Sequence, residues 1–402
     1  MTTRSDQPGR HAGMPQLLLL LGASSMSVLG AVLIAPVLPL MAQHFAAVPG
    51  VAVLVPIVLT VPALVIGLTA GFAGAIVDRL GRMRVLQAAL ILYAIAGTAP
   101  LYLDDIGAII ATRVVVGLCE AAIMTAATTL IGDYWTGEQR NRYLGLQATV
   151  AALSAVVFVA LGGLLGTGGW RAPFWMYLLS IVLVLPMARV LWNPAPADGT
   201  RAERTPVPWA AIAAPCAVTL FGGIVFYALI VQLSYVLDGI GVTSTGVIGA
   251  AVAIMSVATA IGGAVFGRLS CAALRSLLVA EFTLSGIGLL VVFLTSSVPV
   301  VVVGAVVTGF GTGLMLPTLL TWAVRDLEYA QRGRGTGVWT GALFIGEFVS
   351  PLVIVVIAGP AGGLQPALAV LGVLSLVFAA VLWRVLAGRP VALVAERGAV
   401  ST

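Results

Sequence analysis

The sequence has 402 residues, of which 60% are hydrophobic and 9% are charged, and its formal net charge is +5. A soluble domain carries about 25% charged residues, so this composition indicates a protein that lies mostly in a lipid bilayer. The basic residues other than histidine are all arginines, and the lack of lysine excludes a Walker-type phosphate loop and a lysine Schiff base. We therefore expect a membrane protein that is not an enzyme and has no cofactor.

Twelve stretches are long and apolar enough to cross a bilayer as helices, which takes about 20 residues each. A polar, proline-rich segment divides these stretches into two groups of six. We predict an all-α integral membrane protein with an N-terminal six-helix bundle (1–192), a cytoplasmic linker (193–208) and a C-terminal six-helix bundle (209–402). The twelve predicted spans are residues 17–41, 51–71, 85–103, 107–131, 143–166, 173–192, 209–236, 244–266, 276–295, 298–323, 337–358 and 364–386.

The arginines indicate how the spans are oriented. With the N-terminus in the cytoplasm, every arginine except Arg113 and Arg171 falls on the cytoplasmic side, as the positive-inside rule requires. This pattern predicts a multi-pass membrane protein with both termini in the cytoplasm. The absence of lysine and the richness in alanine, glycine and valine suggest a bacterial gene, and hence a bacterial inner (plasma) membrane. The net positive charge is then a topology signal, and we expect no nucleic-acid partner.

The two groups of spans look like copies of one another. Three segments recur in chain order at nearly constant offsets of 189 to 192 residues, which favours two pseudo-symmetric bundles produced by duplication. The matching pairs are GAIVDRL at 74–80 with GAVFGRL at 263–269, VVVGLCEAAIM at 114–124 with VVTGFGTGLML at 306–316, and RYLGL at 142–146 with RGTGV at 334–338.

A compact charged segment, GAIVDRLGRMR at 74–84, follows the second span. Asp78 and Arg82 are helical neighbours at i and i+4, and Asp133 ends the fourth span on the same side of the membrane. These three groups can pair and can stabilise the positive N-terminus of a facing helix, for which we expect the eleventh span. The simpler alternative is a charged turn that only anchors the topology.

Two charged residues lie within the fourth span, where burial of a charge costs about 3 kcal/mol or more. Arg113 and Glu120 are two turns apart on one face, about 10 Å along the helix, and we expect them to share a water-filled cavity. Glu120 is interpreted as a proton-exchanging carboxylate, and the alternative is a permanent hydrogen-bonding group between helices. Arg113 can tune a carboxylate, relay protons through water or bind an anionic substrate, and the alternative is packing through carbonyl groups.

Two further acids lie in spans of the second half. Glu347 is ten residues into the eleventh span, where it is either a second titrating site or a protonated acid that takes the place of a glutamine. Glu281 follows Arg275 by six residues, so we expect its side chain to snorkel to the membrane surface. Tyr227 and Gln232 of the seventh span are predicted, with Arg113, Glu120 and Glu347, to contact an amphipathic substrate.

The chain resembles the major facilitator superfamily over essentially its whole length. The segment after the second span matches the superfamily's loop signature G-x-x-x-D-R-x-G-R at Gly74, Asp78, Arg79, Gly81 and Arg82. LIAPVLPLM, ATRVVVGLCEAA and GRGTGVWTGALFIGEFVSPL are similar to the bacterial drug/proton antiporter branch. FVALGG at 158–163 departs from the G-P-x-x-G-G element of that branch and keeps only its two glycines.

The resemblance implies the major facilitator fold and transport by alternating access, by a protein that functions as a monomer in the bilayer. It implies proton-coupled efflux of small amphipathic compounds or drugs, with protons and a small molecule as partners. The alternative is a proton-coupled symporter or a uniporter that imports a small organic acid or another metabolite, with Arg113 binding its carboxylate. The resemblance also implies a latch that closes the cytoplasmic side, made of Gly74, Asp78, Arg79, Gly81, Arg82 and Asp133.

Overall fold

The computed structural model describes residues 12–193, 207–269 and 272–387. Regular structure in these residues is almost entirely helical, and twelve segments are long and apolar enough to cross a membrane, which confirms the predicted fold class. The helices are α1 (Met14–Val32), η1 (Ala35–Val37), α2 (Leu38–His44), α3 (Val51–Thr69), α4 (Ala73–Leu80), α5 (Arg82–Thr98), η2 (Ala99–Leu101), α6 (Ile106–Tyr134), α7 (Gly137–Gly166), η3 (Ala172–Leu178), α8 (Leu179–Val190), α9 (Trp209–Gly239), α10 (Thr245–Leu269), α11 (Leu274–Phe293), α12 (Val298–Arg325), α13 (Tyr329–Ala361) and α14 (Leu364–Val385).

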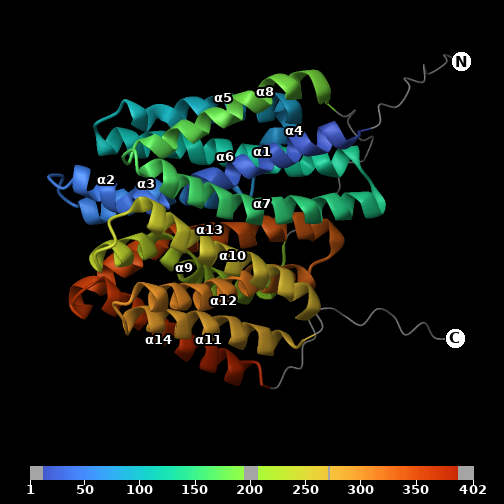
Figure 1. The fold of residues 1–402 in the computed structure, drawn as a ribbon. Coiled ribbons are helices and arrows are strands. Elements are labelled where there is room, and N and C mark those ends of the chain that lie inside the picture. The colour runs from blue at the N-terminus through green and yellow to red at the C-terminus, as the bar shows by residue number, and fades with distance from the viewer. Residues whose placement is uncertain (1–11, 194–206, 270–271, 388–402) are drawn as a thin grey trace, which may run out of the picture.

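The helices form two six-span bundles that lie side by side. Helices α1 to α8 make up the upper bundle in Figure 1 and helices α9 to α14 the lower one. The beginning of α1 and the end of α14 lie on one face of the molecule, which we call the terminal face (Figure 1). Most of the predicted linker, residues 194–206, lies outside the described residues, so the boundaries between the bundles stay a prediction.

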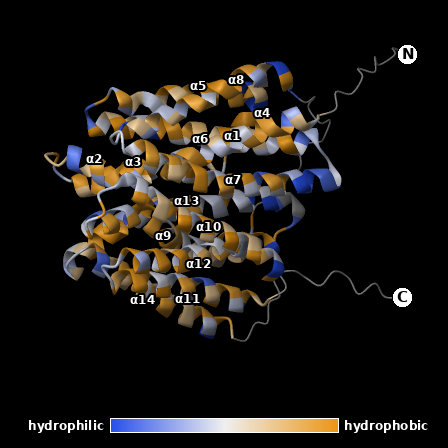
Figure 2. Ribbon diagram, viewed as in Figure 1, coloured by the Kyte–Doolittle hydropathy of each residue, from blue (hydrophilic) through white to orange (hydrophobic). Residues whose placement is uncertain are grey.

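The surface follows the expected division between lipid and water. Figure 2 shows hydrophobic residues along the middle of the bundles and hydrophilic residues gathered toward the ends of the helices. Many large apolar side chains are exposed on the flanks, among them Leu153 at 56%, Leu185 at 60% and Val303 at 56%. Exposed apolar flanks are stable only against lipid, so this surface fits a protein that spans the bilayer.

Three of the predicted spans contain a short 3-10 segment with a proline, which is Pro36 in η1, Pro100 in η2 and Pro173 in η3. The first span is not one helix over 17–41, because α1 ends at Val32 and the chain continues as η1 and α2 around Pro36 and Pro39. Proline lacks an N–H group and its ring clashes with the preceding turn, so a helix cannot run through such a pair unchanged. The third span ends in the same way, with η2 formed at Pro100.

The second span ends earlier than predicted, and the charged segment forms its own helix. Helix α3 stops at Thr69, and α4 begins at Ala73 after three turn residues. Gly81 joins α4 to α5 with φ at 91° and ψ at 117°, a conformation that favours glycine. The matching segment of the second half is the end of the continuous helix α10. The two copies therefore differ in structure at this place.

The bundles touch one another at two levels. Away from the terminal face, a Cβ atom on Gly163 of α7 would lie 2.6 Å from the Cα atom of Gly249 of α10. Near the terminal face, a Cβ atom on Gly67 of α3 would lie 3.2 Å from the carbonyl oxygen of Gly341 of α13. Contact at both levels encloses the space between the bundles, and the candidate site lies in that space.

Candidate functional site

A small cavity lies between the two bundles, and its volume of about 20 Å³ leaves room for about one water molecule. Two carboxyl groups face it, Glu120 from α6 of the first bundle and Glu347 from α13 of the second. Both side chains are buried, with exposed fractions of 1% and 5%. The rest of the lining is apolar or weakly polar and consists of Ser27, Ala31, Leu59, Pro62, Ala63, Ile66, Tyr227 and Phe344.

Close helix packing fixes the position of Glu120. A Cβ atom on Gly30 of α1 would lie 1.9 Å from the Glu120 Oε1 atom, so only glycine leaves room for the carboxyl group. One turn before Glu120, a Cβ atom on Gly117 would lie 2.8 Å from the Cα atom of Pro62 in α3. The acid is therefore enclosed beside α1 and α3, and its side chain lines the cavity.

The hydroxyl group of Tyr93 contacts the enclosed acid. Its oxygen lies 3.2 Å from the Glu120 Oε1 atom and 2.7 Å from the carbonyl oxygen of Met26, to which it donates. The backbone N–H of Gly30 donates to the same hydroxyl oxygen at 3.1 Å. The sequence analysis missed Tyr93, because a tyrosine in the apolar third span carries no signal that separates it from packing or interfacial tyrosines.

Glu347 is held by the packing of α13 against α9. A Cβ atom on Gly346 would lie 2.3 Å from the carbonyl oxygen of Leu220, and Ser350 donates a hydrogen bond of 2.7 Å to the carbonyl oxygen of Ile224. These contacts fix the backbone of α13 on both sides of the acid. The structure thus brings together the two acids that the sequence analysis proposed for proton coupling.

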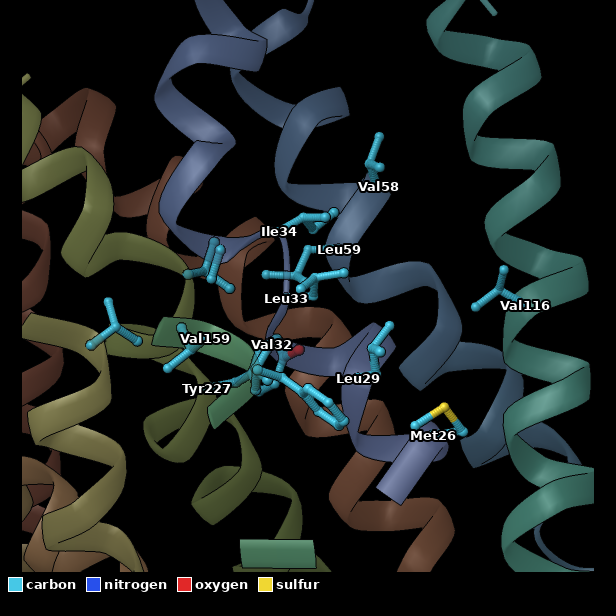
Figure 3. Packing of buried hydrophobic residues seen from close by; sticks show 14 of the residues in the cluster. Met26, Leu29, Val32, Leu33, Ile34, Val58, Leu59, Val116, Val159 and Tyr227 are labelled. Carbon is cyan, nitrogen blue, oxygen red and sulfur yellow. The ribbon is translucent and has the colours of Figure 1, made fainter. Parts of the chain in front are cut away.

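Tyr227 joins the bundles beside the cavity. Its hydroxyl group donates a hydrogen bond of 2.6 Å to the carbonyl oxygen of Ala31 in α1, and Figure 3 shows its ring reaching α1 beside Val32. Gln232, the other predicted substrate contact on α9, is buried at 4% exposure but is not among the residues that line the cavity. The predicted roles of both residues in substrate binding stay predictions.

Arg113 requires a correction, because it does not share the cavity with Glu120. Its guanidinium group turns into the first bundle, where it donates to the Tyr177 hydroxyl at 3.0 Å and to the carbonyl oxygens of Ala96 and Gly97 at 2.7 and 3.1 Å. The Cζ atom also lies 5.1 Å from the centre of the Tyr177 ring. The cause is the end of α5, whose free carbonyl groups attract a cation. The predicted roles of Arg113 in proton coupling and substrate binding stay predictions.

Glu281 also requires a correction, because it does not snorkel. Its side chain is 0% exposed within α11, and neither carboxyl oxygen makes a hydrogen bond in the part of the chain that the structure describes. Arg275, six residues earlier, lies instead with its Cζ atom 3.3 Å from the centre of the Trp383 ring. The side chain is enclosed because α12 and α14 both pack closely against α11.

The predicted latch is assembled on the terminal face of the first bundle. Arg82 contacts Asp78 at 2.9 Å between Nε and Oδ1 and also pairs with Asp133. Helix α4 packs against α5 and α6, and the backbone N–H of Met83 donates to the Asn193 side chain at 3.1 Å. Arg79 is exposed, and a Cβ atom on Gly74 would meet open space. The charged cluster therefore fastens helices of one bundle, and its role in closing the cytoplasmic side stays a prediction.

The sequence matches the family model of the Major Facilitator Superfamily over residues 20–270 and 215–400. The chain belongs to this superfamily. It is therefore a membrane transporter and not an enzyme, as the sequence analysis predicted.

Individual relatives match parts of the chain. It is 28% identical over 229 residues to the class C tetracycline resistance protein of Escherichia coli, a match that covers 56% of each protein. It is 31% identical over 133 residues to the quinolone resistance protein NorB of Staphylococcus aureus, which covers 33% of this chain and 28% of that protein. The chain thus matches little more than half the length of the tetracycline resistance protein and less than a third of the length of NorB.

A solved structure with the same fold is that of a bacterial homologue of the human lysosomal transporter Spinster, in an inward-facing and unoccupied conformation. It matches with a TM-score of 0.76 and 14% identity, over 95% of this chain and 98% of that chain. At this identity the likeness concerns the fold alone. Six-and-six bundles around a central site are typical of such transporters.

Proposed function

We propose that this transporter exports small amphipathic compounds in exchange for protons by alternating access. The observation that carries the proposal is the pair of carboxyl groups, Glu120 and Glu347, which face one cavity from opposite bundles. Acids inside a membrane protein are expensive to bury and mark proton or substrate pathways. The partial likeness to tetracycline and quinolone resistance proteins supports export.

In the proposed cycle Glu120 is the main proton carrier. An ionised Glu120 attracts either a proton or the polar end of a substrate, and both need the same enclosed carboxyl group, so they bind in turn. Tyr227 and Phe344 offer aromatic faces to the apolar part of the substrate. Glu347 contributes a second carboxyl group from the other bundle, so that binding in the cavity affects the contact between the bundles.

Everted membrane vesicles with an acidified lumen and a pH-sensitive dye test this proposal. Cationic, neutral and anionic compounds are added outside, and recovery of dye fluorescence reports protons leaving as a compound enters. We expect recovery with at least one class of compound in the wild type. Glu120→Gln should remove it, because the amide keeps the shape of the acid but cannot exchange a proton.

Thr312→Val is the matched control, since Thr312 occupies in α12 the position that corresponds to Glu120 and is equally buried. It should leave the response within about two-fold of wild type, as expected of a substitution away from the transport chemistry. Full recovery in Glu120→Gln would overturn the assignment of the proton carrier. No recovery with any compound would favour the import of a small organic acid, to be tested with labelled acids in right-side-out vesicles.

A further inference from the structure

Tyr93 occupies an unusual place in the backbone of α1. In an α-helix the N–H of one residue bonds to the carbonyl four residues earlier, and Gly30 and Met26 are such a pair. The Tyr93 hydroxyl lies against both groups, donating to the Met26 carbonyl oxygen at 2.7 Å and accepting from the Gly30 N–H at 3.1 Å. A side chain that enters the backbone ladder of a helix is a known cause of local bending.

The same hydroxyl lies 3.2 Å from the Glu120 Oε1 atom. A phenol has one proton to donate, so it cannot donate to the Met26 carbonyl and to a carboxylate at once. We propose that Tyr93 is a positioning residue that transmits the proton occupancy of Glu120 to the turn Met26–Gly30 of α1. This inference rests on the proposed role of Glu120 as the proton carrier.

The exchange involves only hydrogen bonds and one proton. When Glu120 is protonated, its O–H donates to the Tyr93 oxygen, and the Tyr93 O–H continues to donate to the Met26 carbonyl oxygen. When the acid releases its proton to the cavity, the Tyr93 O–H turns to the Glu120 carboxylate and leaves the Met26 carbonyl. A charge-assisted hydrogen bond is about twice as strong as a neutral one, which makes the second arrangement favourable.

The groups around Glu120 make Tyr93 the partner that responds. The titratable groups near the acid on neighbouring helices are Tyr93 of α5, Tyr177 of η3, Tyr227 of α9 and Glu347 of α13. Cys119 adjoins Glu120 on α6, and Arg113 is two turns away with its guanidinium group on Tyr177. On the cavity side, α1 and α3 contribute aliphatic side chains and Ser27. Of these groups, Tyr93 is the one whose hydroxyl lies within hydrogen-bond distance of the acid.

The affected turn leads directly to the contact between the bundles. Ala31 follows Gly30, and its carbonyl oxygen accepts the hydrogen bond of 2.6 Å from Tyr227 of the second bundle. Figure 3 shows Met26, Leu29 and Val32 of α1 along this path, with Tyr227 beside Val32. A change in the Met26–Gly30 turn therefore changes the geometry of the carbonyl group that holds the two bundles together at the cavity.

Hydrogen–deuterium exchange of the full-length protein in lipid nanodiscs tests the inference without any substrate. The rate of the peptide that contains Met26–Val32 is compared at acidic and alkaline pH after correction for the chemical pH dependence of exchange. We expect the corrected rate in wild type to differ by about five-fold, the size of one ordinary hydrogen bond. Tyr93→Phe and Glu120→Gln should each abolish the difference, and their combination should add nothing.

Tyr177→Phe is the control, because it removes a buried hydroxyl from the ring next to Tyr93, 4.9 Å away between ring centres, and spares the α1 turn. It should keep the pH difference. A wild-type difference that survives in Tyr93→Phe would overturn the inference, as would a wild type without any difference. Because the assay needs no transport, failure of proton exchange in the vesicle assay combined with a retained pH response would reject the proposed function separately.

Discussion

The two bundles repeat one pattern of spans, and both contain buried polar contacts and close glycine packing, but they differ in how they surround a buried charged group. In the first bundle, buried polar side chains bond to the backbone of neighbouring helices, as Arg113 does at the end of α5 and Ser180 does at the Leu90 carbonyl oxygen, 2.9 Å away. In the second, glycines let backbones touch: a Cβ atom on Gly313 of α12 would lie 2.1 Å from the Thr259 carbonyl oxygen of α10. The comparison teaches that duplicated halves can keep one architecture while only one of them surrounds a charged group with fixed polar partners.

The largest effect is expected from removing the polar anchor of the first bundle. Arg113→Ala leaves two buried carbonyl groups and a tyrosine hydroxyl without their donor, which should lower the free energy of unfolding by about 3 kcal/mol. Arg171→Ala removes a less buried arginine that pairs with Asp104 and donates to the Pro100 and Leu103 carbonyl oxygens, and it should lower the free energy of unfolding by only about 1 kcal/mol. Thermal unfolding in detergent measures both variants. Equal losses would contradict the view that burial makes Arg113 the anchor.

A smaller loss is expected from disturbing the glycine packing of the second bundle. Gly313→Ala places a methyl group against backbone that cannot move away, and overpacking of this kind costs about 2 kcal/mol. Gly263→Ala serves as the control in the same helix pair, because its nearest contact would be an ordinary 3.5 Å. Alanine also favours helix over glycine, so the control should be neutral or stabilising by about 0.5 kcal/mol. The same unfolding assay compares the two, and a stable Gly313→Ala would refute the packing argument.

A further difference between the bundles is the charged cluster on the terminal face of the first bundle. We expect its removal to affect the rate of transport. Asp78→Asn removes one of the two carboxylates that contact Arg82, and an exposed pair is worth about 1 kcal/mol or less. We expect turnover to fall by about five-fold or less while the apparent affinity for substrate stays the same. Gly267→Asp, which places an acid at the corresponding position of α10, should not restore the rate in this background. A large loss of affinity at normal turnover would count against a latch.

The smallest effect is expected at Glu281. This acid is buried in the second bundle away from the cavity, so Glu281→Gln should leave proton-coupled transport within about two-fold of wild type. Glu347→Gln removes the cavity acid of the same bundle and should reduce coupling more strongly. The vesicle assay with the pH-sensitive dye compares the two variants. The opposite order would show that the important acid of this half lies outside the cavity.

The span pattern was predictable because lipid leaves the backbone few choices. Every backbone group in the bilayer must bond within its own helix, so long apolar stretches identify the spans, although Pro36 and Pro39 break one of them. Glu120 and Glu347 were also predictable as candidates, since an acid in such a stretch is costly and therefore uncommon. Their meeting in one cavity follows from the packing of the two bundles.

Side-chain direction and partners could not be predicted from one sequence. Helical spacing places Arg113 and Glu120 on one face of α6, but long side chains turn toward whichever neighbour offers acceptors, and the free carbonyl groups of Ala96 and Gly97 attract the arginine. The distance of Glu281 from Arg275 suggested the membrane surface, whereas the enclosure by α12 and α14 depends on tertiary packing. Tyr93 becomes recognisable only when α1, α5 and α6 are assembled.

The placement of one acid from each bundle at the cavity also bears on the energy source of transport. A carrier that returns with one proton after exporting a neutral compound moves one net charge, and a membrane potential of 100 mV contributes about 2.3 kcal/mol per charge moved. If both Glu120 and Glu347 return protonated, two charges move and the potential contributes twice as much. Exchange of one proton for a monovalent cation moves no net charge and draws on the pH gradient alone. The number of acids that titrate in this cavity, together with the charge of the exported compound, therefore sets whether transport is electrogenic.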